Sequence, residues 1–224
     1  MNQKVKMKPS YLKIAFLDRD GTIIKDYPDE KWREIKEPEF LEGSIEGLKR
    51  LKERGYDFII ITNQYLINDG IISLNDYQQF TGKFLKKLKE ENIDILKIYF
   101  CPHNEKDHCH CKKPKPGMIE QAKKDFLIDM NSSIYIGDSQ VDYLLAKHFN
   151  LTFYGINYNG DNVKSYRSIL EISKQIKKIQ NKWIFYKFSK AYSIASLTAP
   201  SLQLETTLYA FSWITFSALF GAKE

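Results

Sequence analysis

Residues 13–22 read KIAFLDRDGT, an apolar run followed at once by acids and a glycine. Residues 14–17 have the length and uniform hydrophobicity of a buried central strand. Asp18 and Asp20 come directly after it, and Gly21 permits a sharp turn that would bring both carboxylates into one crevice. Such oxygens suit Mg²⁺, but Asp-Gly is also common in simple exposed turns. This stretch alone leaves a metal site and a plain turn equally open.

Strand-like and helix-like patterns alternate along the rest of the chain. Further strands are predicted over 56–62, 95–100, 133–136 and 151–156, and helices over 43–54 and after Ser73, Pro116 and Val141. The polar stretch 23–40 predicts a flap or a long loop. The alternation predicts an α/β fold, with a doubly wound, Rossmann-like parallel sheet of about five strands.

The composition narrows the class of ligand and the cellular compartment that we expect for this protein. The 224 residues include 34 Lys and Arg against 28 Asp and Glu, a net charge of +6 that favours small anionic ligands. The excess is too modest and dispersed to predict a nucleic-acid partner. No apolar segment of a secretory signal is visible in MNQKVKMKPS, and the three cysteines cluster with histidines, which indicates a reducing compartment. We expect a cytoplasmic protein.

Polar side chains gather at the ends of three predicted strands. Asp18 and Asp20 follow the first, Thr62 ends the second, and Asp138 follows the fourth, with Asp142 four residues later. Ligands of open α/β sheets bind at the carboxyl ends of the strands, near the switch point of the strand order. Each acid alone could cap a helix, but three strands that deliver acids or hydroxyls to one edge predict a binding site.

The motifs DRDGT, ITN, a lysine in KKPKPG and GDSQVD resemble, in this order, the four motifs of the haloacid dehalogenase (HAD) phosphatase superfamily. The resemblance implies that Asp18 is the nucleophile, forming an aspartyl-phosphate, and that Asp20 is the general acid and then the base. Mg²⁺ would be held by Asp18, the backbone carbonyl of Asp20 and Asp138, with Asp142 in support. Thr62 and a lysine would hold the phosphoryl oxygens.

The choice of lysine stays open among three. Lys113 matches the superfamily pattern best, Lys112 takes the place usually held by an arginine that grips substrate, and Lys115 is a weaker candidate. A lysine at 112 keeps the charge of arginine but loses its bidentate phosphate binding. Asn63 and Gln64 are candidates for positioning substrate, although a simple turn after the strand explains them nearly as well.

A second constellation lies in CPHNEKDHCHC, residues 101–111. Three thiols and an imidazole with the spacing C-x-H, five residues, C-x-C are typical of a closed tetrahedral Zn²⁺ site. The predicted ligands are Cys101, His103, Cys109 and Cys111. His108 and His110 are spare, and a redox or incidental cysteine cluster is the alternative. With four protein ligands the zinc would be structural and would fix the loop that carries Lys112 and Lys113.

The zinc loop followed by KPKPGM resembles the D-glycero-D-manno-heptose 1,7-bisphosphate phosphatases and the related histidinol-phosphate phosphatases. FLDRDGTI and GYDFIIITNQ are similar to the heptose enzymes in particular. This implies a small sugar-phosphate substrate and no large cap domain, so that loops alone shape the pocket. YLINDG after TNQ and DYPDEKW after DRDGT depart from the pattern, so catalysis transfers more safely than substrate identity. The alternatives are histidinol phosphate as substrate, or a catalytically dead, zinc-stabilised binding module.

The resemblance covers roughly the first three quarters of the chain. We expect a phosphatase domain over residues 1–182 and an apolar C-terminal tail over 183–224. The strongly apolar part, 208–220, is shorter than the ~20 residues that a membrane span needs. Packing of the tail on the domain is favoured over contact with a partner or a membrane surface, and over a sequence foreign to the fold.

Overall fold

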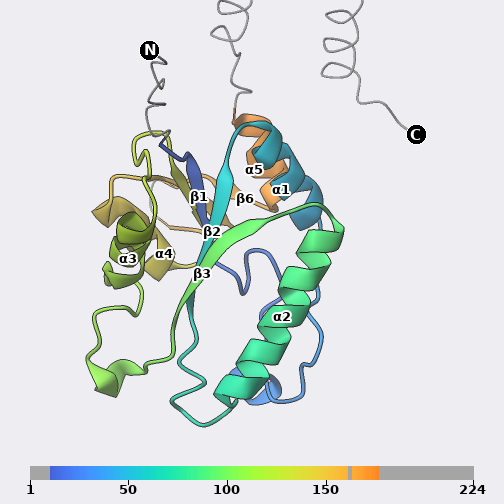
Figure 1. Ribbon diagram of the computed structural model, residues 1–224, viewed down its shortest axis with the longest axis vertical. Coiled ribbons are helices and arrows are strands. Elements are labelled where there is room, and N and C mark those ends of the chain that lie inside the picture. Colours follow the sequence, from blue (N-terminus) through green and yellow to red (C-terminus); the bar gives the residue numbers. More distant parts are fainter. Residues whose placement is uncertain (1–10, 161–162, 177–224) are drawn as a thin grey trace, which may run out of the picture. The chain divides into compact units, whose positions relative to one another are not determined.

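The computed structural model describes residues 11–160 and 163–176, which form a parallel sheet flanked by helices (Figure 1). The strand order within this part is β3-β2-β1-β4-β5-β6. The strands are β1 Ile14–Leu17, β2 Asp57–Asn63, β3 Ile95–Cys101, β4 Ile134–Gly137, β5 Thr152–Ile156 and β6 Ser165–Tyr166. The α-helices are α1 Ser44–Glu53, α2 Leu74–Glu90, α3 Gly117–Asp125, α4 Gln140–His148 and α5 Ile169–Gln175, and two short 3-10 helices span Asp29–Lys31 (η1) and Glu105–Asp107 (η2).

The predicted fold class is confirmed. All five predicted strands are present and parallel, and no additional domain is inserted between them within residues 11–160. The sixth strand, β6, pairs with β5 through only two residues, which is too short to give a periodic signal in the sequence.

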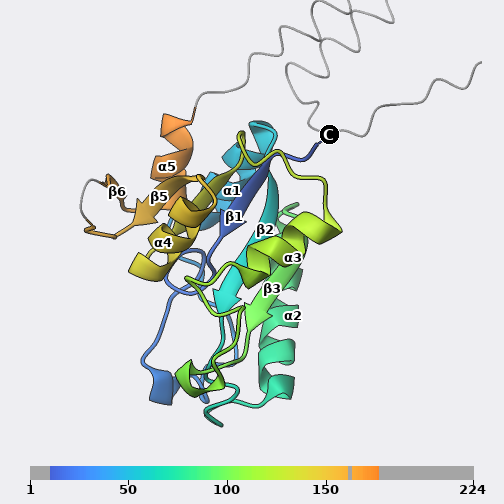
Figure 2. The ribbon, with the colours of Figure 1, turned by 90° about the vertical axis from the view of Figure 1, so that its left-hand side faces the viewer.

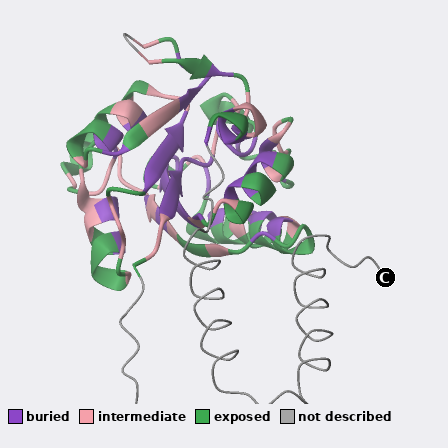
Figure 3. Cartoon of the chain, turned by 90° about the horizontal axis from the view of Figure 1, so that it is seen from above, coloured by how far each residue is buried: buried purple, intermediate pink, exposed green. Residues whose placement is uncertain are grey.

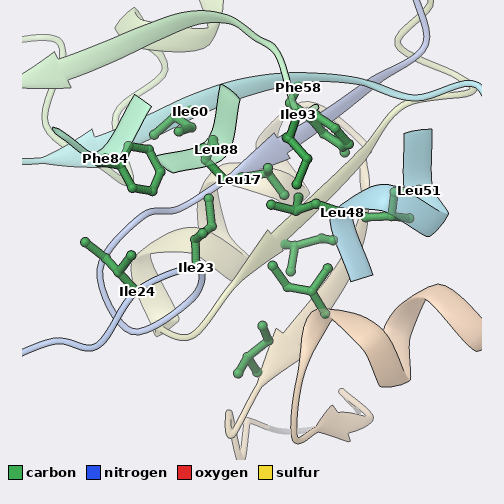
Figure 4. Close-up of a cluster of buried hydrophobic side chains, with 14 of the residues drawn as sticks. Leu17, Ile23, Ile24, Leu48, Leu51, Phe58, Ile60, Phe84, Leu88 and Ile93 are labelled. Carbon is green, nitrogen blue, oxygen red and sulfur yellow. The ribbon is translucent and has the colours of Figure 1, made fainter. Parts of the chain in front are cut away.

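Alternate residues of the central strand face opposite sides of the sheet, so each face has its own core. Ala15 and Leu17 pack in the cluster that α1, α2 and α5 cover, and Ile14 and Phe16 pack in the cluster that α3 and α4 cover. Figure 2 shows the helices on the two sides of the sheet, and Figure 4 shows part of the first cluster, with Leu17 near the side chains of α1 and α2. The central strands β1, β2 and β4 are largely buried, whereas the outer helix surfaces are largely exposed (Figure 3). The continuous apolar run of β1 reflects burial on both faces.

Two predicted helix starts are confirmed. The hydroxyl of Ser73 accepts a hydrogen bond from the Asp76 backbone N–H at 3.0 Å, and the Asp76 carboxylate accepts one from the Ser73 N–H at 3.1 Å. This capping box begins α2. Pro116 immediately precedes α3, where its missing N–H costs no helical hydrogen bond.

The polar stretch 23–40 is a loop, as predicted, but it is anchored. Ile23 and Ile24 are fully buried, and Trp32 is only 7% exposed. Ile24 also forms a β-bridge with Phe40, which closes the loop at its base. Sparse hydrophobic residues therefore fix this flap on the first core cluster.

The order in which strands are added switches sides at β1, because β2 lies on one side of β1 and β4 lies on the other. The Asp18 N–H donates to the Ile136 carbonyl at 2.9 Å, so the ladder continues past the end of β1. Gly21 has φ +79°, and a Cβ there would collide with the Asp138 carboxylate. This turn therefore requires glycine for its backbone conformation and for the close approach of the two strand ends.

The predicted tail, 183–224, and its boundary after residue 182 lie outside the described residues and stay predictions. Among the helices of the described ranges, none combines the length and the hydropathy that a membrane span requires.

Candidate active site and metal centres

The predicted acids converge where β1 and β4 end. Asp18 follows β1, Asp138 follows β4, and Asp142 lies in the first turn of α4. One carboxylate oxygen from each lies within 4.8 Å of those of the other two. The sheet thus brings together groups that are more than a hundred positions apart in the sequence.

These acids line a cavity of about 240 Å³ at the carboxyl edge of the sheet. Its other lining residues come from the flap, the end of β2 and the segment that follows the cysteine cluster. The lining comprises Asp18, Asp20, Asp26, Asp29, Trp32, Thr62, Asn63, Gln64, Tyr65, Leu66, Lys113, Asp138, Ser139, Val141 and Asp142. Among these described residues six are acids and one is a base, so the cavity suits a divalent cation or a positively charged group.

Lys113 lies buried between two of the acids. Its Nζ is 2.5 Å from Asp18 Oδ1 and 2.7 Å from Asp142 Oδ1, and the residue is 4% exposed. Burial by itself would lower the pKa of Lys113, but the charges of Asp142 and Asp18 outweigh it and raise the pKa. The amine is therefore a fixed cation beside the Asp18 carboxylate.

Asn63 fixes the backbone at Lys113. Its side-chain Oδ1 accepts a hydrogen bond from the Lys113 N–H at 2.9 Å, and its Nδ2 donates to the Lys113 carbonyl at 3.3 Å. The substrate contact predicted for Asn63 stays a prediction. Its hydrogen bonds give it the additional task of tying the end of β2 to the lysine.

Crowding of the carboxylates affects their protonation. Burial raises the pKa of Asp18 well above its usual value; Lys113 opposes this rise, whereas Asp142 and Asp138 add to it. Burial and the neighbouring Asp142 raise the pKa of Asp138 to about 7. Hard oxygen ligands with excess negative charge are what Mg²⁺ requires, so this cluster fits the predicted ion.

Thr62 and Gln64 form a polar pair at the end of β2. Gln64 Nε2 donates to Thr62 Oγ1 at 2.9 Å and to Asp20 Oδ2 at 2.7 Å. Because Thr62 Oγ1 accepts this bond, its own proton is available to an oxygen of a bound ligand. Both amide hydrogens of Gln64 are engaged within the protein, and its predicted substrate contact stays a prediction.

The other two candidate lysines lie elsewhere. Lys112 Nζ is 2.7 Å from a Glu105 carboxylate oxygen and 5.0 Å from the centroid of the Tyr65 ring. Lys115 is exposed, and its Nζ donates to the Cys109 carbonyl at 2.7 Å. Neither is among the lining residues given for the cavity in the described part of the chain. Tyr65 does line it, so Lys112 lies near the cavity rim.

The four predicted zinc ligands meet in one place. Cys101 Sγ lies 2.9 Å from Cys111 Sγ and 3.6 Å from Cys109 Sγ, and His103 Nδ1 lies 3.2 Å from Cys111 Sγ. Tetrahedral zinc with Zn–S bonds of about 2.3 Å separates its ligand atoms by roughly 3.3–3.8 Å, close to this spacing. A disulfide would need an S–S distance of about 2.05 Å, so the thiols are free. The donor set fits structural zinc.

The two remaining histidines of this loop are exposed. His108 ends η2 with φ +46°, and a ring nitrogen of His110 lies 2.9 Å from Glu120. Neither belongs to the four-residue cluster. The loop is also hydrogen-bonded to the segment after β2. Asn68 donates to Asp107 at 2.9 Å, and Asn104 donates to Asp69 at 2.8 Å.

Sequence reasoning assigned no role to three residues that orient the site. Tyr135 and Ser139 both donate hydrogen bonds to the Asp142 carboxylate, and Arg19 binds Asp20. Ser139 lies inside the GDSQVD motif, where its hydroxyl beside an acid was a usable signal. A charged residue within DRDGT was the signal for Arg19, whereas Tyr135 sits in an apolar strand and gives none.

Comparison with known proteins gives the family from the sequence and the fold from solved structures. Residues 13–159 match the family described as polynucleotide kinase 3 phosphatase. A D-glycero-alpha-D-manno-heptose-1,7-bisphosphate 7-phosphatase of Photorhabdus laumondii is 44% identical over 144 residues, covering 61% of this chain and 77% of the relative. A D-glycero-beta-D-manno-heptose-1,7-bisphosphate 7-phosphatase of Helicobacter pylori is 42% identical over 135 residues, covering 59% and 76%.

A similar solved structure is the D,D-heptose 1,7-bisphosphate phosphatase of B. bronchiseptica, which was complexed with magnesium and phosphate. It has a TM-score of 0.65 and 21% identity, and the match covers 73% of this chain and 97% of that one. At this identity the likeness establishes a shared fold.

Proposed function

The chain belongs to the polynucleotide kinase 3 phosphatase family of HAD-type phosphoric monoester hydrolases, and we propose that it hydrolyses a small sugar phosphate through an aspartyl-phosphate on Asp18. The observation that carries the proposal is the meeting of Asp18, Asp138 and Asp142 within 4.8 Å, with Lys113 between two of them. This geometry supports the roles proposed for Asp18 as nucleophile, for Asp138 as metal ligand and for Lys113 as a fixed cation.

The reaction then follows from the residues in place. An Asp18 oxygen attacks phosphorus while the bond from phosphorus to the sugar oxygen breaks, and Asp20 gives that oxygen a proton. Water then attacks the aspartyl-phosphate and passes a proton to Asp20, which releases inorganic phosphate and restores Asp18. Lys113 and the Thr62 hydroxyl bind phosphoryl oxygens in both steps.

Two metal ions belong to the proposal. Mg²⁺ would be held by Asp18, the backbone carbonyl of Asp20 and Asp138, with Asp142 in support. When bound, it supplies the positive charge that lets a carboxylate approach an anionic phosphate. Structural zinc on Cys101 and its three neighbouring ligands would keep the loop before Lys113 in place. A site of reduced thiolates also supports a cytoplasmic location.

The proposed substrate is D-glycero-D-manno-heptose 1,7-bisphosphate, hydrolysed at the 7-phosphate. Relatives that are 44% and 42% identical carry this name for the two anomers, and they support it. Histidinol phosphate is the second candidate, because Asp26 and Asp29 line the cavity and would attract a cationic amine.

Phosphate release from a panel of substrates tests the proposal. The panel contains both anomers of heptose 1,7-bisphosphate, histidinol phosphate and simple sugar phosphates, each with and without Mg²⁺. We expect Mg²⁺-dependent release from a heptose bisphosphate, with ³¹P NMR showing loss of the 7-phosphate signal. Faster release from histidinol phosphate would select the second candidate. No release from any member would favour a binding protein that has lost catalysis.

A further inference from the structure

Arg19 is a buried charge that the phosphoryl-transfer chemistry does not use. It is 1% exposed, and its guanidinium lies 5.9, 5.4 and 5.3 Å from the ring centroids of Trp32, Tyr77 and Phe80. It lines a separate cavity of about 110 Å³, whereas Asp18 lines the larger one. A buried charge is costly unless it is paired, so its partner is informative.

That partner is the carboxylate of Asp20. Arg19 Nε donates to Asp20 Oδ1 and Arg19 Nη2 donates to Asp20 Oδ2, both at 2.9 Å. Two parallel bonds from a planar guanidinium fix the plane of a carboxylate as well as its position, which a single point charge cannot do.

Further hydrogen bonds hold both Asp20 and Arg19 in place. Gln64 adds a third donor to Asp20 Oδ2 at 2.7 Å and also bonds Thr62. Arg19 Nη1 donates to Thr81 Oγ1 of α2 at 3.4 Å. The Asp20 carboxylate, 15% exposed and lining the larger cavity, is therefore oriented from two directions by side chains that cannot easily move.

We propose that Arg19 is a positioning residue for Asp20 and that Gln64 assists it. The inference rests on the proposed function, in which Asp20 gives the leaving oxygen its proton. Such a group must be within hydrogen-bond reach of that oxygen, and a misplacement of about 1 Å can cost about a hundredfold in rate. Aromatic side chains of α2 and the flap surround the Arg19 guanidinium and hold it in place. Arg19 in turn fixes the orientation of the Asp20 carboxylate.

The test compares two leaving groups. The proposed sugar phosphate releases an alkoxide that needs a proton, whereas p-nitrophenyl phosphate releases a stable phenolate that does not. The value of kcat/KM reports the steps up to formation of the aspartyl-phosphate. We expect Arg19→Lys and Arg19→Met to lower kcat/KM by about a hundredfold on the sugar phosphate and by less than about threefold on p-nitrophenyl phosphate.

Matched variants complete the design. Lys83→Met, also on α2, removes an exposed ion pair with Glu37, and it should change kcat/KM for both substrates by less than about twofold. Gln64→Leu should show the same discrimination as Arg19→Lys, but weaker. Circular dichroism and zinc content check the fold; if Arg19→Met does not fold, Arg19→Lys and Gln64→Leu carry the test.

Equal losses on both substrates in the Arg19 variants would overturn the proposal, because a purely structural role lowers both alike. Asp20→Asn separates this failure from that of the proposed function. If Asp20→Asn discriminates between the substrates and the Arg19 variants do not, the positioning role is wrong and the function stands. If Asp20→Asn shows no discrimination, the role of Asp20 itself is wrong.

Discussion

The carboxylate cluster at the ends of β1 and β4 and the thiol cluster after β3 are both predicted metal sites, yet they are built in opposite ways. Asp18 and Asp138 meet only because the sheet places β1 beside β4. The four thiol-cluster ligands lie within residues 101–111 and meet through the path of one loop. The first site depends on the whole fold and the second on local spacing.

The two sites also differ in the contacts of their acidic or thiol groups and in how open they are to a ligand. In the carboxylate cluster a buried lysine lies against two of the acids, and the cavity stays accessible to a ligand. In the thiol cluster the four ligand atoms face one another, so an ion there would have no free position for substrate. The difference indicates chemistry at the first site and support at the second.

The sharpest test of this contrast is Asp18→Asn. Loss of the proposed nucleophile should lower kcat by at least about 10⁴-fold, because the proposed aspartyl-phosphate can then no longer form at residue 18. Zinc content and the thermal unfolding midpoint should stay close to those of the wild type. Asp94→Asn, at an exposed acid that pairs with Lys89, is the matched control and should keep full activity. Activity above about a tenth of wild type in Asp18→Asn would place the chemistry elsewhere.

Three substitutions can decide which lysine binds the phosphoryl group, a choice that the sequence leaves open. Lys113→Met should lower kcat by about 10²–10³-fold, because it removes the fixed cation beside Asp18 and leaves Asp18 and Asp142 without their cationic partner. Lys115→Met should change kcat by less than about twofold. Lys112→Met should act mainly on KM, in line with its place near the rim. Steady-state kinetics would contradict this order if Lys115→Met were the most damaging.

The supporting role of the thiol cluster predicts a smaller loss. Cys109→Ser should reduce zinc to below one ion per chain, lower the unfolding midpoint by roughly 10 °C and lower kcat by roughly tenfold. His110→Ala, in the same loop but outside the cluster, should leave zinc content and unfolding unchanged. Loss of zinc in His110→Ala, with zinc retained in Cys109→Ser, would mean that the ligand set is wrong.

The weakest expected effect is the pH dependence of the carboxylate cluster. The folded protein raises the pKa of Asp138 from 3.8 to about 7, so in the metal-free protein its stabilising effect is full below about pH 4 and is lost as pH rises through about 7. Mg²⁺ binds the ionised form, so its affinity should rise roughly tenfold from about pH 6 to about pH 8. Calorimetric titration measures this, and Asp138→Asn should weaken the dependence, with the remainder coming from Asp18. The thiol cluster offers no such response to Mg²⁺.

Much of this fold could be predicted from the sequence because its signals are local. The strands are uninterrupted apolar runs, and Ser73 with Asp76 forms a capping box within four residues. The order of motifs along a doubly wound sheet also predicts that Asp18 and Asp138 end at one edge.

The remaining features depend on contacts between distant residues. The paired hydrogen bonds of Arg19 with Asp20 form because α2 and the flap enclose the guanidinium; the motif DRDGT shows the charge of Arg19 but not this enclosure. The backbone of Lys113 is held likewise by Asn63, fifty positions earlier. β6 is too short to carry a periodic signal of its own.

The paired hydrogen bonds between Asn63 and the backbone of Lys113 have a consequence for a cell that is short of zinc. They attach the lysine to the end of β2, independently of the cysteines. When zinc is scarce, newly made chains should therefore keep a fraction of their turnover, and supply of the dephosphorylated sugar should slow without stopping. The side-chain amide of Asn63 would then preserve part of the activity when zinc is limiting.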